Sequence, residues 1–260
     1  MGSSPRISFI IPVFNEELNI KRVLTNLHEI LSAHPHWNAE VIVIEDGSRD
    51  GTKQAILEAL ETYPKIQLIL HERNMGYTQS LKDGIRKARG TFLMYVGADE
   101  EFDCSELPAF MEPLFSGEAD VVLGVRWQRN AYKLFRFFLS VIYIFFLNYL
   151  FKLRINDYNW SQAWPKELLD RVELQSKSLF VLPEIIIKAH DLKYRIKEVP
   201  SNHRGRQFGK SSVNFRIMGR ALSDALSFWN YRKSGRYHPA RSPESETFPP
   251  KPSVTIDTLR

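Results

Sequence analysis

The first half of the chain alternates short apolar runs with segments of helical periodicity. The apolar runs read RISFIIPV, AEVIVIE, KIQLILH, TFLMYV and ADVVLGV. Between them, the spacing of apolar residues predicts helices over 17–33, 51–63, 77–89 and 105–116. This strand–helix repetition predicts an α/β fold with a mostly parallel central sheet. The nearly unbroken Val, Ile and Leu of the runs indicate that helices cover both faces of the sheet.

In open sheets of this kind, ligands bind beyond the carboxyl ends of the strands. The candidate site residues therefore lie in the segments that directly follow the predicted strands. These are residues 12–16, 45–48 and 97–101, together with Arg126.

After Arg126 an apolar segment interrupts the repetition. Residues 137–151, FFLSVIYIFFLNYLF, are apolar on every helical face except at Ser140 and Asn148, and basic residues flank them. A helix of this length spans about 22 Å, which is less than the roughly 30 Å of a bilayer core. We expect a helix within 131–154 that lies in the membrane interface with its basic ends toward anionic headgroups. A helix buried in protein is the first alternative, and a true span is the second.

Two further elements complete the predicted domain. KYRIKEV, residues 193–199, predicts one more strand, and 213–232 has the apolar spacing of an amphipathic helix. That helix packs either on the core or on a membrane. The segment 233–260 is rich in Pro, Ser and charge and is predicted to be disordered. We therefore expect a single domain over 5–232, followed by a polar tail.

The charges divide unevenly along the chain. Residues 1–124 carry 11 Lys and Arg against 19 Asp and Glu, a net charge of −8, whereas 125–260 carry 24 against 11, a net charge of +13. Such a basic half favours an anionic partner, either a phosphorylated substrate or a membrane surface, although a solvated basic face is the simpler explanation. No motif that reads nucleic acid is present, so nucleic acid is not a predicted partner.

Cys104 is the single cysteine, which excludes an intrachain disulfide and favours a reducing compartment. The apolar run at 7–13 lacks the small-residue cleavage site of a secretory signal. We expect a cytoplasmic protein associated peripherally with the cytoplasmic face of a membrane.

Several motifs occur in a fixed order: IIPVFNEELNI, EDGSRDGT, RNMGYTQSLKDGIRKARG and GADEE, then GVR at 124–126, the acid Asp157 and HRGRQFGKS. This set resembles the family 2 glycosyltransferases of the GT-A fold. The later motifs narrow the resemblance to the polyprenyl-phosphate sugar synthases, of which dolichyl-phosphate mannose synthase is one type. The resemblance covers residues 5 to about 230.

The resemblance implies a nucleotide-sugar site. Asp46, at a strand end, can accept a hydrogen bond from the ring N–H of uracil or guanine, and Glu16 can accept one from the ribose or base. The donor-binding set is completed by the apolar residues Pro12, Phe14, Ile44 and Ala98. The simpler explanation of DGS and RDGT is turn and helix-cap chemistry in front of the helix at 51–63.

Asp99 and Glu101 are the predicted metal ligands. Alternate residues of an extended chain point the same way, so both carboxylates can face one divalent cation, Mg²⁺ or Mn²⁺, together with substrate phosphates. The resembled family has Asp-x-Asp followed by Gln two residues on, whereas Gly97 here takes the place of the first acid. This departure indicates a different metal preference or donor. Alternatively, the acids only cap the helix at 105–116, a role that fits Asp103 better than Asp99.

The leaving nucleoside diphosphate needs cationic groups. The resemblance implies Arg126, Arg204 and Lys210 for this role. Asp157 either acts as a base or orients the acceptor or a basic side chain, since DYNWSQAW departs from the family's Asp-x-x-Ser-Gly-Phe. His71 and His203 have no partner at metal-ligand spacing and are predicted to be structural.

The sequence predicts metal-dependent, inverting transfer of a hexose from a GDP- or UDP-linked donor to a polyprenyl phosphate, dolichyl or undecaprenyl. A lipid monophosphate has a second pKa of about 6 and needs little activation as a nucleophile. One alternative is a saccharide hydroxyl acceptor, and another is a nucleotide-binding scaffold without activity. The protein works either peripherally on the membrane or with a separate membrane subunit.

Overall fold

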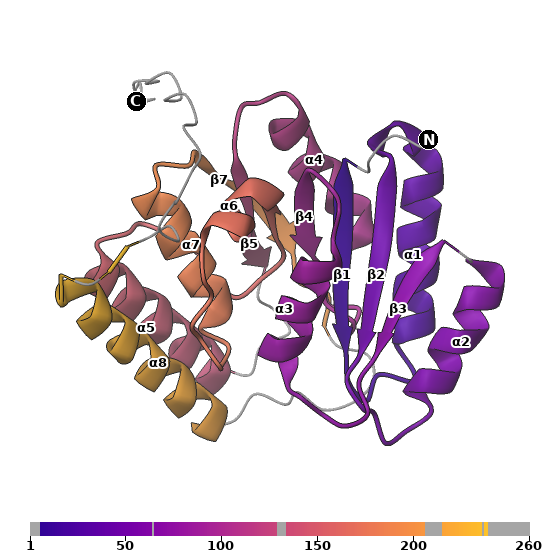
Figure 1. The fold of residues 1–260 in the computed structure, drawn as a ribbon, viewed down its shortest axis with the longest axis horizontal. Coiled ribbons are helices and arrows are strands. Elements are labelled where there is room, and N and C mark those ends of the chain that lie inside the picture. Colours follow the sequence, from indigo (N-terminus) through magenta and orange to yellow (C-terminus); the bar gives the residue numbers. More distant parts are fainter. Residues whose placement is uncertain (1–5, 64, 129–133, 206–214, 236, 239–260) are drawn as a thin grey trace.

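The computed structural model of the chain describes residues 6–63, 65–128, 134–205, 215–235 and 237–238. Strands within these ranges form one sheet in the order β3-β2-β1-β4-β6-β5-β7 (Figure 1). The strands are β1 Ile7–Val13, β2 Ala39–Glu45, β3 Ile66–Leu70, β4 Phe92–Tyr95, β5 Val121–Gln128, β6 Gln162–Pro165 and β7 Ile196–Asn202.

The sheet is mostly parallel, as predicted. β1 pairs in parallel with β2 and β4, β2 with β3, and β5 with β7. β6 lies antiparallel between β4 and β5. The pattern of the sequence did not predict β6, a strand of four residues that is held by partners on both sides. Because β6 opposes both neighbours, β4 and β5 run in the same direction.

Helices cover both faces of the sheet. The helices are α1 Ile20–Ala33, α2 Thr52–Thr62, α3 Tyr77–Lys87, α4 Leu107–Phe115, α5 Leu134–Phe151, α6 Lys166–Arg171, α7 Val181–Asp191 and α8 Phe215–Lys233, with 3-10 turns at Pro35–Trp37 and Cys104–Glu106. One core lies under α1, α2 and α4, and the other lies under α3, α5, α6, α7 and α8. Successive side chains of β1 point to opposite faces of the sheet. Phe9 and Ile11 therefore lie in the core under α1, α2 and α4, and Ile10 lies in the other core. The predicted α/β class is therefore confirmed.

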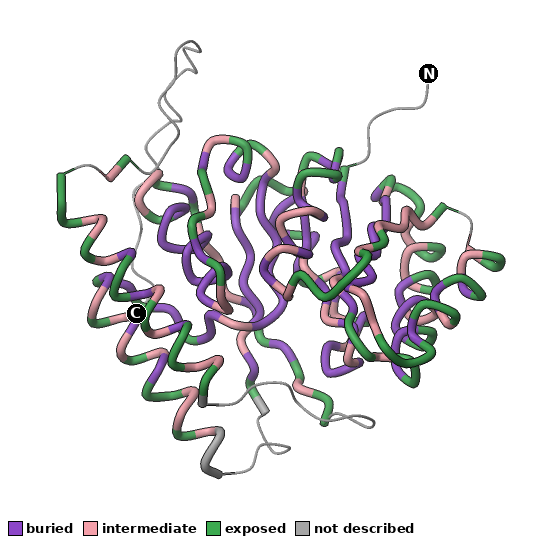
Figure 2. Tube along the Cα trace, turned by 60° about the horizontal axis from the view of Figure 1, so that its bottom comes forward, coloured by how far each residue is buried: buried purple, intermediate pink, exposed green. Residues whose placement is uncertain are grey.

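α5 and α8, the two predicted interfacial helices, lie side by side at one end of the molecule (Figure 1). α5 buries Tyr143, Leu147 and Phe151 in the core. Its opposite face is a stripe of exposed apolar side chains at helical spacing: Phe138 58%, Val141 43%, Ile142 63%, Phe145 72% and Tyr149 78% exposed. Figure 2 shows the strands buried and the outer sides of the helices exposed. Within the described ranges, no helix has the length and hydropathy to cross a bilayer.

Past α8 the structure describes Ser234, Gly235, Tyr237 and His238. Tyr237 packs edge-on against Phe228 with ring centroids 5.6 Å apart, and its hydroxyl donates to Asp191 at 2.8 Å. Tyr237 lies within the predicted tail and makes these two contacts with α8 and α7. Residues 239–260 lie outside the described ranges.

Candidate active site at the carboxyl edge of the sheet

The predicted site residues follow strands that end at one edge of the sheet. β1, β2 and β4 are parallel, and β5 runs in the same direction as β4, so their carboxyl ends share this edge (Figure 1). Register places Val13 opposite Glu45 and Ile10 opposite Tyr95. The sheet topology thus brings the segments after 13, 45, 95 and 126 together, as a ligand site in this fold requires.

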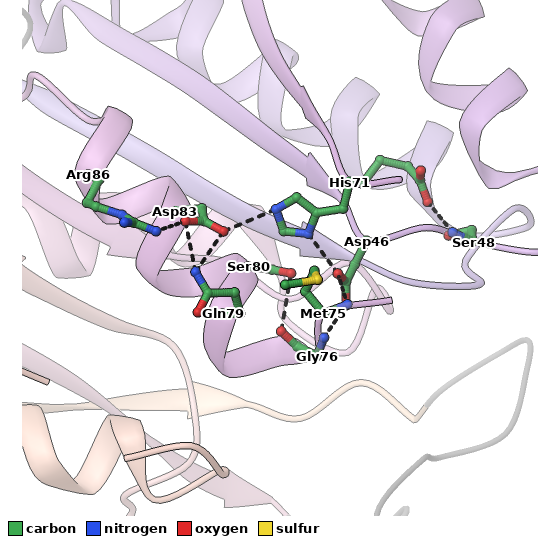
Figure 3. Close-up of polar contacts among 10 residues, drawn as sticks. Asp46, Ser48, His71, Met75, Gly76, Gln79, Ser80, Asp83 and Arg86 are labelled. Carbon is green, nitrogen blue, oxygen red and sulfur yellow. Dashed lines mark hydrogen bonds and ion pairs between the residues drawn. The ribbon is translucent and has the colours of Figure 1, made fainter. Parts of the chain in front are cut away.

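Asp46 directly follows β2 and is 2% exposed. Its carboxylate accepts hydrogen bonds from the backbone N–H of Met75 at 2.8 Å, from that of Gly76 at 2.8 Å, and from Nδ1 of His71 at 2.8 Å (Figure 3). Tyr77, the residue after Gly76, is the first residue of α3, so the Asp46 carboxylate also lies at the positive end of the α3 dipole. Asp46 therefore organises the loop between β3 and α3, in addition to any ligand contact.

His71 connects this loop to α3. Its Nε2 lies 3.1 Å from Asp83, whose carboxylate is also bound by Gln79 and Arg86 (Figure 3). An imidazole between two carboxylates can donate to both only when both nitrogens carry protons. The sequence predicts a structural role for His71. In the structure, His71 lies between the carboxylates of Asp46 and Asp83.

The turn at residues 45–48 is hydrogen-bonded to the segment that follows β1. Glu45 accepts from the backbone N–H of Ser48 at 2.6 Å, and the Ser48 hydroxyl accepts from that of Asn15 at 3.0 Å. Gly47 has φ +65°, and a Cβ there would lie 2.4 Å from the backbone of Arg73. Only glycine fits this crossing of two loops.

The predicted apolar wall and its neighbours differ in accessibility. Phe14 is 39% exposed and Pro12 is partly buried, so both can meet a ligand. Ala98 is 6% exposed. Ile44 is 0% exposed, and its side chain packs against α3 at Gly84, so the core takes up that side chain. Glu16 accepts from the Asn19 amide at 2.7 Å, just before α1.

The acidic loop after β4 carries the predicted metal ligands. Oδ1 of Asp99 accepts from the backbone N–H of Glu101 at 3.3 Å, and it would lie 3.0 Å from a Cβ at Gly97. Oε2 of Glu101 lies 3.1 Å from Nε2 of His203, a residue just past β7. His203 is thus brought to the acidic loop from 102 positions along the chain. Sequence reasoning missed this contact, because no local spacing reports it.

Arg126 and Asp157 form a buried fork. Nε of Arg126 donates to Oδ2 of Asp157 at 2.6 Å and Nη2 to Oδ1 at 2.8 Å. The side chains are 7% and 1% exposed, and the guanidinium stands over the ring of Trp160 at 4.9 Å. Asp157 thus holds the guanidinium of Arg126 in place, and its predicted roles in the reaction stay predictions.

The pKa of Tyr95, the last residue of β4, responds to charged groups of the site. Burial raises the pKa of Tyr95 well above its ordinary value, the charges of Asp99 and Glu101 raise it further, and Arg126 opposes them. The phenol therefore stays protonated and lies within electrostatic reach of both acids and of the fork. A Cβ at Gly97 would lie 3.0 Å from Oδ1 of Asp99 and 3.7 Å from the Tyr95 hydroxyl, so these two side chains flank Gly97.

Of the two remaining predicted cations, Arg204 lies beside the acidic loop. The backbone N–H of Arg204 donates to the carbonyl of Glu101 at 2.9 Å, and its guanidinium pairs with Asp103. Arg204 is thereby placed next to the predicted metal ligands. Lys210 lies outside the described residues.

The donor set fits a divalent cation. Carboxylate oxygens and an imidazole nitrogen are ligands that Mg²⁺ and Mn²⁺ accept. In the ranges that the structure describes, no three His, Cys, Asp or Glu side chains already converge as a closed ligand cluster. An ion held by Asp99 and Glu101, with His203 as a third candidate, would complete its shell with substrate phosphates and water.

A mostly parallel α/β sheet with helices on both faces is the architecture of the GT-A fold, and solved structures share it. Glucosyl-3-phosphoglycerate synthase from Mycobacterium tuberculosis, in complex with Mg²⁺ and uridine diphosphate, superposes with a TM-score of 0.68 at 16% identity, over 89% of this chain and 80% of that chain. The same enzyme with Mn²⁺, uridine diphosphate and glucosyl-3-phosphoglycerate gives 0.66 at 17% identity, over 89% and 80%. At such identities the likeness shows the GT-A fold alone.

Sequence comparison gives the family. Residues 8–177 match glycosyl transferase family 2, and the chain belongs to this family. A dodecaprenyl-phosphate galacturonate synthase of Rhizobium johnstonii is 26% identical over 235 residues, 86% of this chain and 66% of that protein. A dolichol-phosphate mannosyltransferase of Mycosarcoma maydis is 27% identical over 129 residues, 48% and 44%. The chain thus spans less than two thirds of the length of each of these curated relatives.

Proposed function

We propose that the chain transfers a hexose, with inversion, from a nucleoside-diphosphate sugar to a polyprenyl phosphate at a membrane surface. In the reaction, a phosphate oxygen of the acceptor bonds to the anomeric carbon, and the bond from that carbon to the donor's β-phosphate oxygen breaks. The nucleoside diphosphate leaves with the electron pair. The two curated relatives named above are, by their names, enzymes that act on polyprenyl or dolichol phosphate.

One observation carries the choice of a phosphate acceptor. A sugar hydroxyl needs a positioned base, and Asp157 is the acid that the sequence offers for it. Asp157 is 1% exposed and both of its oxygens are bound by Arg126. A carboxylate in that position holds a guanidinium in place and is poorly placed to take a proton from substrate. An acceptor that is already ionised removes the need for a base.

The residues of the edge have separate roles in this proposal. Phe14 and Pro12 form the wall of the base site, and Asp46 shapes that site through the loop at 75–76. Arg126, held flat by Asp157, and Arg204 face the diphosphate, where charge develops as the bond breaks. Asp99 and Glu101 would hold a Mg²⁺ or Mn²⁺ ion, which supplies electrostatic stabilisation of the leaving diphosphate.

The exposed stripe of α5 supports the membrane part of the proposal. Phe138, Ile142 and Phe145 offer apolar area to the headgroup–acyl boundary, and α8 beside them carries Lys233 in its last turn. A peripheral protein of this kind meets its lipid acceptor in the plane of the cytoplasmic leaflet. A separate membrane subunit would add to this docking.

The test is a transfer assay with defined substrates. The purified chain is incubated with labelled GDP- and UDP-sugars and with dolichyl or undecaprenyl phosphate in vesicles, with and without Mn²⁺ or Mg²⁺. We expect metal-dependent label in the organic extract, and loss of that label in Asp99→Asn. Label that appears only on a soluble glycan contradicts the lipid acceptor. Nucleotide binding without transfer to any acceptor contradicts the enzyme and favours a scaffold.

A further inference from the structure

Glu100, between the two predicted metal ligands, has an unusual backbone. Its φ is +61°, in the left-handed region that non-glycine residues rarely adopt. It is also 8% exposed, although glutamate is seldom buried without a partner. The reversal of the chain at Glu100 lets Oδ1 of Asp99 accept from the N–H of Glu101, which closes a tight turn. The geometry of both ligands therefore depends on how Glu100 is held.

Arg22 of α1 forms an ion pair with the Glu100 carboxylate. Nη2 of Arg22 lies 3.0 Å from Oε1 of Glu100. In the described part of the chain, Oε2 of Glu100 is buried without a hydrogen-bond partner, so this ion pair is a main compensation for the buried charge. Arg22 itself is anchored, because its neighbours Ile20 and Val23 are buried under the sheet.

The other side of the turn is fixed by the chain after β7. Phe102 forms an isolated antiparallel bridge with His203, and the N–H of Arg204 donates to the carbonyl of Glu101 at 2.9 Å. The turn is thus held from two sides, by α1 through Arg22 and by the 203–204 segment. Glu100 thus pairs with Arg22 of α1, whereas Oε2 of Glu101 lies 3.1 Å from Nε2 of His203.

We propose that Arg22 is a positioning residue for the metal site: through its ion pair with Glu100, it keeps the 99–101 turn in the conformation that lets Asp99 and Glu101 bind one divalent cation. The inference rests on the proposed function, since it assumes the cation. Groups that orient metal ligands typically change metal affinity 10–100-fold when removed. The Arg22 side chain is 47% exposed, and solvent screens such a pair, so we expect a value near the lower limit, about tenfold.

The experiment measures binding of Mn²⁺ directly, without turnover. Free Mn²⁺ is followed by electron paramagnetic resonance during titration of the full chain with Mn²⁺ in the presence of UDP or GDP. Arg22→Met should weaken binding about tenfold, and Arg22→Lys should recover part of the loss. Lys21→Met is the matched control, because Lys21 lies on the same helix as Arg22 and forms an exposed pair at 3.4 Å with Glu58 of α2. It should leave the affinity unchanged.

A double-mutant cycle tests whether Arg22 acts through Glu100. Glu100→Gln keeps the length of the side chain and removes the charge. If the inference is correct, Arg22→Met adds little to the loss already caused by Glu100→Gln. Fully additive losses, or wild-type affinity in Arg22→Met, overturn it.

Asp99→Asn separates this inference from the proposed function. If the wild type binds Mn²⁺ and Asp99→Asn does not, the metal site is supported and the Arg22 variants decide the inference alone. If Asp99→Asn binds as the wild type does, the metal part of the proposed function fails, and the inference fails with it. Circular dichroism of each variant confirms that the fold is retained.

Discussion

Asp157→Ala removes the carboxylate that holds Arg126, and leaves a guanidinium that is 7% exposed without its main counter-charge. Removing one partner of a buried ion pair costs about 3–5 kcal/mol, because the other charge stays desolvated. Both hydrogen bonds of the fork are short, 2.6 and 2.8 Å, which places the expected loss within that range. The free energy of unfolding, from urea denaturation followed by tryptophan fluorescence, should fall by about 3–5 kcal/mol.

Two further variants show whether burial is the cause. Glu118→Ala breaks the exposed pair with Lys197, whose side chains are 58% and 38% exposed, and should cost at most about 1 kcal/mol. Arg126→Met combined with Asp157→Leu removes both charges and should recover most of the stability lost in Asp157→Ala, although not the activity. A loss below about 1 kcal/mol in Asp157→Ala, equal to that of Glu118→Ala, refutes the reasoning.

Three other expectations concern separate parts of the molecule. Replacing Phe138, Ile142 and Phe145 by Ser should release the protein from anionic vesicles with little change in melting temperature, because these side chains are exposed; unchanged co-sedimentation contradicts membrane docking. Burial raises the pKa of the Cys104 thiol to about 12, so iodoacetamide at pH 8 should modify it only after unfolding; equal rates in both states contradict this. His71→Leu removes one hydrogen-bond donor from the buried carboxylate of Asp46 and should lower the free energy of unfolding by about 1–3 kcal/mol. It should also raise the KM for the nucleotide sugar more than it lowers kcat; a change in kcat alone argues against a role in the base site.

The pattern of apolar residues predicted the strands and helices of the first half because most of them bury a continuous apolar face, although β3, at the edge of the sheet, is only partly buried. β1 and β2 are buried along nearly their whole length, and α1 carries a well-defined apolar side. The strand predicted at 193–199 is observed later, at Ile196–Asn202, because pairing with β5 sets its limits. β6, α6 and α7 were not predicted. β6 exists through its partners, and nothing within Gln162–Pro165 alternates.

The candidate site could be predicted where it depends on strand ends, and not where it depends on long-range pairing. Asp46 and Asp99 follow β2 and β4, and Arg126 lies near the carboxyl end of β5, so the sheet brings all three to one edge. The contact between Glu101 and His203 and the fork between Arg126 and Asp157 join residues 102 and 31 positions apart. Local spacing carries no record of either, since sheet order decides which loops meet.

The central claim is that Asp99 and Glu101 hold a divalent cation against the diphosphate of a sugar donor. Diffraction at the manganese edge, from crystals soaked with Mn²⁺ and UDP or GDP, tests it most directly. We predict an anomalous peak within roughly 2.6 Å of carboxylate oxygens of both residues and in contact with the nucleotide phosphates. Bound nucleotide with no such peak, or with the peak at other side chains, would contradict the account.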